Sequence, residues 1–258
     1  MLVTGYGRGV LAIAALVPDT ALLVPGAAGR ASVLPEVRRA AVDAAGELVR
    51  ARPDRVVVVS PGPADRRLAA PLRPSLAAAG IDDATLGWSI PDAGAGAGEI
   101  VVPAIGAGVA LLLLAHAGWT GPVTVAEVAS SSTDPTRAAA LRALGAELVA
   151  GPDRTALLVA GSLGARHGPH APAAEDDRAA PFDTATLADL ALGDPLARQR
   201  LAQIPAELAA ELLVSGWAPL QVLVGAAGDA APYAAEVRHA SAPLGVTYAV
   251  AVWRGVQP

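Results

Sequence analysis

The sequence predicts a single α/β domain in which a mixed central sheet is flanked by helices. Short apolar segments bounded by glycine or proline alternate with longer segments of helical pattern, the order typical of layered α/β proteins. Apolar residues make up 53% of the 258 residues and aromatic residues only 3%. The core must therefore be built from alanine, valine and leucine. No stretch of linker-like composition divides the chain, so we expect residues 1–258 to form one domain.

The first half of the chain is predicted to alternate strands and helices. Residues 10–17, 56–60 and 123–128 are short apolar runs and are expected to be strands. A helix is expected from Pro35 to Ala51, because a proline suits the first helical turn and Pro53 stops it. A second helix is expected from Thr133 to Ala150, with Ser132 or Thr133 as its cap and Gly151-Pro152 as its end.

The second half begins with a predicted strand at 155–160 and a long irregular loop from Gly161 to Pro181. Helices are expected at 184–192, 195–203, 206–216 and 219–227, followed by a hairpin of strands at 235–239 and 245–253. The strands at 10–17, 56–60 and 155–160 are uninterruptedly apolar. We therefore expect them to lie in one central sheet that is covered on both faces.

Composition excludes several classes of function. All 19 basic residues are arginine and the net charge is −5, so there is no basic stripe for nucleic acid and no lysine for a Schiff base or a P-loop. The absence of cysteine excludes disulfides and thiolate chemistry. We expect a cytoplasmic protein that is not inserted in a membrane. Charged residues are only 17%, so the surface either carries much alanine or is partly buried against a partner, such as a second copy of the chain.

A glycine-rich turn offers one candidate binding motif. Gly106 and Gly108 follow the apolar residues 100–102, and Glu127 lies about 20 residues further on, as in dinucleotide-binding fingerprints. Leu111 stands at the third glycine position and Pro103 breaks the preceding strand, which favours a strand–turn–helix packed without a ligand. The same reading accounts for the apolar stretch 100–119, which has nearly the length of a membrane span.

Two histidines lie in the loop after the strand at 155–160. His167 and His170 are followed by the carboxylates Glu175, Asp176 and Asp177, and loops at the carboxyl ends of strands are where α/β folds place their chemistry. A His-x-x-His pair with a carboxylate can bind a metal ion. The alternative is a solvated polar loop without a ligand.

Six segments together resemble the class III extradiol ring-cleavage dioxygenases, closest to the subunit-B-like branch common in actinobacteria. The segments are 15–25 (ALVPDTALLVP), 55–62 (RVVVVSPG), 157–162 (LLVAGS), 178–183 (RAAPFD), 210–216 (AELLVSG) and 242–253 (APLGVTYAVAVW). They are spread over nearly the entire chain, so the resemblance is to one full-length domain.

The resemblance implies an Fe(II) centre held by two histidines and a carboxylate, with a further histidine as acid–base catalyst. The positions of the two ligand histidines are occupied by Asp19 and Gly62, and the catalytic histidine falls near Ala165, with His167 two residues on. No clear counterpart of the late carboxylate is found between Val246 and Trp253. The sequence therefore resembles the scaffold of the family more than its metal site.

Three hypotheses follow for the function. The first is a non-catalytic or divergent relative that needs no cofactor and binds an unknown small molecule or a protein. The second is an active metal-dependent oxygenase or hydrolase with a rebuilt site, in which Asp19 holds the metal and His167 and His170 take part in catalysis; Fe(II) is the ion that the family activity would require. The third is a dinucleotide-binding enzyme that uses Gly106, Gly108 and Glu127.

Overall fold

The computed structural model describes residues 10–69, 71–90, 98–130, 134–229 and 232–255. The strands of these residues are β1 (Val10–Val17), β2 (Arg55–Pro61), β3 (Arg66–Ala69), β4 (Leu72–Pro74), β5 (Ile100–Val102), β6 (Val123–Val128), β7 (Arg154–Ala160), β8 (Tyr233–Ser241) and β9 (Tyr248–Gly255). The helices are α1 (Pro35–Arg50), α2 (Ile105–His116), α3 (Arg137–Leu148), α4 (Ala179–Leu192), α5 (Pro195–Ala202), α6 (Ala206–Glu211) and α7 (Trp217–Ala227).

Seven of these strands form one sheet in the order β3-β6-β2-β7-β1-β9-β8. The four strands β6, β2, β7 and β1 are parallel to one another, whereas β3, β9 and β8 pair antiparallel with their neighbours. The predicted α/β class with a mixed sheet is therefore confirmed. The expectation that β1, β2 and β7 belong to one sheet is also confirmed, since these three are neighbours at its centre.

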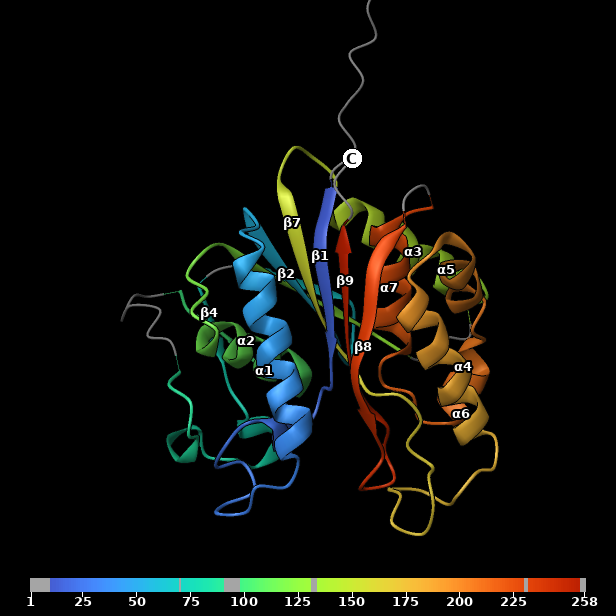
Figure 1. Ribbon diagram of the computed structural model, residues 1–258. Helices are drawn as coiled ribbons and strands as arrows, with labels where there is room; N and C mark the ends of the chain where they lie inside the picture. Colours follow the sequence, from blue (N-terminus) through green and yellow to red (C-terminus); the bar gives the residue numbers. More distant parts are fainter. Residues whose placement is uncertain (1–9, 70, 91–97, 131–133, 230–231, 256–258) are drawn as a thin grey trace, which may run out of the picture.

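Helices cover both faces of the sheet (Figure 1). On one face lie α1 and α2, and α2 is buried along its length from Gly106 to Leu114. The sequence interpretation of 100–119 as a strand followed by a helix is thus confirmed by β5 and α2. Within the described residues, no helix is long and apolar enough to cross a membrane.

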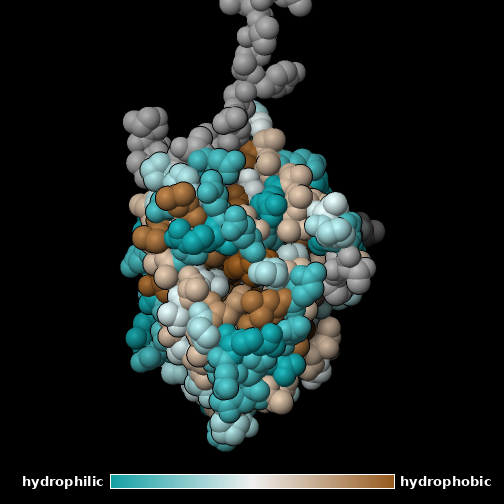
Figure 2. All heavy atoms as spheres, turned by 90° about the vertical axis from the view of Figure 1, so that its right-hand side faces the viewer, coloured by the Kyte–Doolittle hydropathy of each residue, from teal (hydrophilic) through white to brown (hydrophobic). Residues whose placement is uncertain are grey.

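The other face of the sheet is covered by α3 to α7. Helices α3 and α7 cross at very close range because glycines stand at the contact: a Cβ at Gly145 would lie 2.0 Å from the carbonyl oxygen of Val222. The outer side of this layer carries apolar surface near its middle (Figure 2). Three large apolar side chains in the α4–α6 region, Leu192, Leu196 and Leu213, are exposed.

Several predicted boundaries are corrected by the structure. Helix α4 begins at Ala179, five residues before the predicted Thr184, because a proline such as Pro181 is tolerated in the first helical turn. Helix α6 ends at Glu211 instead of Gly216. Leu213 takes a left-handed conformation there, with φ 56°, and the amides of Leu213 and Val214 close the helix on the carbonyls of Ala210 and Ala209.

The starts of helices α3 and α7 and the presence of strand β3 also differ from what the sequence predicts. Helix α3 begins at Arg137, and the caps proposed for it, Ser132 and Thr133, lie outside the described residues. Helix α7 begins at Trp217, two residues before the predicted start. Strand β3 was not predicted from the sequence.

Candidate functional site at the strand ends

The carboxyl ends of the parallel strands meet at one edge of the sheet, at the bottom in Figure 1. Strand β9 runs the opposite way and therefore begins at this same edge. Six polar side chains lie at this edge in two groups, Asp19 with Ser162 and Tyr248, and His167 with Asp183 and Thr247, and we call the six the strand-end cluster. This is the place where open α/β sheets generally bind ligands.

The first pair of the cluster joins β1 to β7. Val17 and Ala160 are partners in the parallel register, so Asp19 and Ser162, each two residues further on, emerge side by side. The Ser162 hydroxyl donates a hydrogen bond of 2.6 Å to Asp19 Oδ1. The Ser162 amide donates to Ser215 Oγ at 3.0 Å. Asp19, the position that the family resemblance assigns to a metal ligand, is thus hydrogen-bonded to a neighbouring side chain.

Tyr248 lies beside this pair at the start of β9 and is only 5% exposed. Burial raises the pKa of its hydroxyl, and the nearby carboxylate of Asp19 raises that pKa further, while a hydrogen bond with Thr20 lowers it. The phenol therefore stays protonated at neutral pH and can donate a hydrogen bond to a ligand or to a protein acceptor.

The second pair joins the loop after β7 to α4. His167 Nε2 lies 2.6 Å from Asp183 Oδ2 and 3.0 Å from Thr247 Oγ1. The other carboxylate oxygen, Asp183 Oδ1, accepts from the amide of Gly164 at 2.9 Å. A hydrogen on Nε2 that donates to Asp183 leaves the second ring nitrogen, Nδ1, as the atom that can exchange a proton or a hydrogen bond with a ligand.

The loop that carries His167 is more ordered than its composition indicates. Residues 161–165 are buried, and the segment pairs with the start of β9: Leu163 and His167 donate their amides to the carbonyls of Thr247 and Gly245. On its other side the amide of Ala165 donates to the carbonyl of Leu212. Residues 161–167 of the predicted irregular loop are therefore held in place on both sides.

The other candidate residues of this loop are not brought to the cluster. His170 is exposed. Asp176 accepts hydrogen bonds from Arg178, whose guanidinium is the main reason that the pKa of Asp176 falls to about 2. The carboxylate that does reach His167 is Asp183, which the sequence analysis missed. A signal for it was present, because Asp183 shares the buried face of α4 with Thr186 and Leu190.

The residues present do not fit the Fe(II) centre that the family resemblance implies. Among the described residues, no three His, Asp or Glu side chains lie together in a way that could hold a metal ion. At the position of the second ligand histidine, a Cβ on Gly62 would lie 2.8 Å from Glu127 Cβ. This position therefore has no room for an imidazole unless Glu127 moves.

The glycines of the dinucleotide-like motif are explained by packing. A Cβ at Gly106 would lie 2.7 Å from Ser60 Oγ, and one at Gly108 would lie 2.8 Å from the carbonyl oxygen of Ser75. Strand β5 pairs with β4 in a separate sheet and not beside β6, so the strand–helix–strand unit of the fingerprint is not formed in the described residues. Glu127 is buried and ion-paired with Arg66. We expect no saturable binding of NAD or FAD.

Comparisons with known proteins give a structural match without a family. No family model matches the chain, and no curated protein matches it. Among solved structures, the uncharacterized protein JW3007 from Escherichia coli K12 is similar, with a TM-score of 0.49 and 14% sequence identity over 94% of this chain and 99% of that chain.

Proposed function

We propose that this protein is a divergent relative of the class III extradiol dioxygenases that binds a hydroxyl-bearing small molecule at the strand-end cluster without a metal ion. The proposal rests on the hydrogen-bond partners of Asp19 and His167, two residues that the sequence predicts to form the site. Asp19 accepts the Ser162 hydroxyl, and His167 is bound to Asp183. Asp19 therefore has a protein partner at a position where the family would need a metal ligand, and His167 has one near the position of the family's catalytic histidine.

The cluster offers suitable groups for such a ligand. The His167 side chain is 19% exposed, and Asp183 holds its ring at Nε2. A carboxylate bound to one nitrogen of an imidazole fixes the ring orientation and the tautomer, which leaves the other nitrogen as a hydrogen-bond acceptor. That nitrogen can accept a hydrogen bond from a ligand hydroxyl, and the Tyr248 phenol is a further donor at the same end of the sheet.

The metal-free character is tested by elemental analysis of anaerobically prepared protein beside its Asp19→Ala and His167→Ala variants. We expect no stoichiometric iron or zinc in any of the three. Near one metal ion per chain in the wild type, lost in both variants, would instead refute the metal-free proposal and favour the rebuilt metal site that uses Asp19 and His167.

Ligand binding is tested by calorimetric titration with catechol, the substrate class that the family resemblance implies. We expect saturable binding that does not consume oxygen and that weakens by about tenfold in His167→Ala, as expected when a hydrogen bond to a polarised group is removed. His170→Ala is the matched control and should bind like the wild type, because His170 is exposed. Equal binding by the wild type and His167→Ala would refute the proposed role of His167.

A further inference from the structure

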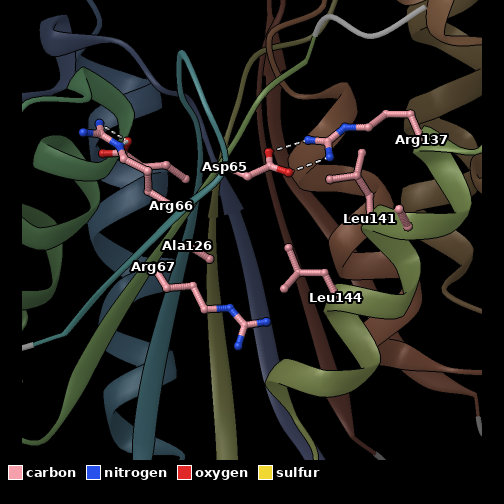
Figure 3. Close-up of a pocket in the computed structure, with 9 residues that line it drawn as sticks. Asp65, Arg66, Arg67, Ala126, Arg137, Leu141 and Leu144 are labelled. Carbon is pink, nitrogen blue, oxygen red and sulfur yellow. Dashed lines mark hydrogen bonds and ion pairs between the residues drawn. The ribbon is translucent and has the colours of Figure 1, made fainter. Parts of the chain in front are cut away.

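A separate hollow of about 330 Å³ lies between strands β3 and β6 and helix α3 (Figure 3). Its apolar wall is formed by Ala126 of β6 and by Ala140, Leu141 and Leu144 of α3. Its rim carries the charged side chains Asp65, Arg67 and Arg137, and Arg66 and Glu127 complete its lining. We call it the arginine hollow. It shares no residue with the strand-end cluster, and its volume is at the lower end of the range for small-molecule sites.

The alternating orientation of side chains along β3 and β6 determines which charged residues face the hollow. Arg67 is the register partner of Ala126, and Arg66 is the partner of Glu127. Successive side chains of a strand point to opposite faces, so Arg67 lies on the α3 side whereas Arg66 points away from it (Figure 3). Arg66 and the buried Glu127 therefore neutralise each other away from α3, and they leave Arg67 as the cation of β3 on the hollow side.

The two arginines of the rim are held to different degrees. Arg137 binds both oxygens of Asp65, at 2.7 and 2.6 Å, and also the carbonyl of Ala129, so its guanidinium is fixed. Arg67 has one bond of 2.9 Å to Glu147, and the two side chains are 47% and 64% exposed. Ion pairs this exposed contribute little to stability. An incoming anion can therefore replace Glu147 at Arg67 with little loss.

We propose that the arginine hollow binds a small molecule with an apolar body and one carboxylate. The apolar body lies against Leu141, Leu144 and Ala126, and the carboxylate takes both donor nitrogens of Arg67 in the fork geometry that guanidinium groups prefer. The Asp65–Arg137 pair closes the opposite end of the hollow and orients the ligand so that its carboxylate lies toward Arg67.

Hexanoate is the probe, and its binding is followed through the amide chemical shifts of the folded, full-length protein. We expect saturable shifts confined to β3, β6 and α3. Arg67→Gln should weaken binding about tenfold or more, the loss expected for a charge-assisted bond. Glu147→Gln should strengthen it, because the competitor for Arg67 is removed. This opposite sign cannot come from a folding defect.

Matched probes and a control variant separate the two halves of the site. Acetate, which lacks the apolar body, and hexanol, which lacks the charge, should each bind more weakly than hexanoate. Arg39→Gln, which removes an exposed arginine of α1 on the other face of the sheet, should leave binding unchanged. The proposal is overturned by an absence of saturable hexanoate shifts, by equal binding in Arg67→Gln, or by acetate binding as tightly as hexanoate.

Discussion

The strand-end cluster and the arginine hollow both gather polar side chains beside the sheet, but they hold them differently. In the cluster, Asp183 and Ser162 are nearly inaccessible and are bonded to groups of distant segments. In the hollow, Arg67 and Glu147 form their pair at the surface. The paired groups of the cluster are therefore part of what holds the fold together, whereas the Arg67–Glu147 pair of the hollow is available for exchange with a ligand.

The largest loss of stability is expected for Asp183→Ala in the strand-end cluster. The substitution leaves the Gly164 amide and the His167 ring without their carboxylate partner in a buried place, which costs about 3 kcal/mol of unfolding free energy. Urea unfolding measures it. Asp177→Ala, which removes an exposed carboxylate of the same region, is the control and should not move the midpoint. A loss for Asp183→Ala no larger than for Asp177→Ala would contradict the structural role of this pair.

A smaller loss of unfolding free energy is expected for Ser162→Ala. The variant removes the 2.6 Å bond to Asp19, and a hydrogen bond to a charged group contributes about 2 kcal/mol. A double-mutant cycle with Asp19→Ala isolates this contribution in urea unfolding. If the losses of unfolding free energy in the two single variants add without coupling, the hydrogen bond between Ser162 and Asp19 contributes nothing to stability. This part of the cluster would then be held as loosely as the Arg67–Glu147 pair of the hollow.

Leu213→Gly should stabilise the protein by about 1 kcal/mol. Leu213 ends α6 in a left-handed conformation, which glycine adopts without the steric cost that a side chain has there. The side chain is 43% exposed, so little burial is lost. The measurement is the urea midpoint, and Leu213→Ala serves as the control because it shortens the side chain but retains its Cβ. A lower midpoint for the glycine variant would show that the Leu213 side chain stabilises this turn.

The smallest effect on stability is expected for Asp65→Asn at the rim of the hollow, and it depends on pH. Hydrogen bonds from Arg137 lower the pKa of Asp65, so this carboxylate contributes stability above its ordinary pKa and loses it as the pH falls through the lowered one. Asp65→Asn should therefore be less stable than the wild type at about pH 6, and the difference should be smaller at about pH 3, below the ordinary pKa of the carboxyl. Thermal unfolding at both pH values tests this. A difference that persists undiminished in acid would contradict the ion-pair explanation.

The fold could be predicted where burial leaves a clear pattern in the sequence. The bounds of β1 and β6 agree with the apolar runs at 10–17 and 123–128, since central strands are covered on both faces. Strand β3 could not be found in this way. It lies at the edge of the sheet, and two of its four residues are arginines that form ion pairs on opposite faces.

The candidate site was predicted only in part. The place of Asp19 and His167 at the strand ends follows from the rule that parallel strands end at a common edge. The partners of these residues do not follow from it. Asp183 reaches His167 because α4 folds back beside the loop, and Ser162 reaches Asp19 through the register of β1 and β7. Such contacts depend on tertiary packing, which local spacing does not encode.

The position of β1 has a consequence for how the chain folds during synthesis. This strand is among the first described residues to leave the ribosome, yet in the sheet it lies between β7 and β9, and β9 is the last strand of the described residues. Contacts between such distant segments form slowly because a long loop must close first. After β7 has been synthesised and has paired with it, the apolar β1 therefore keeps one unpaired edge until β9 follows, and chaperones that bind extended apolar segments can reach this edge in the interval.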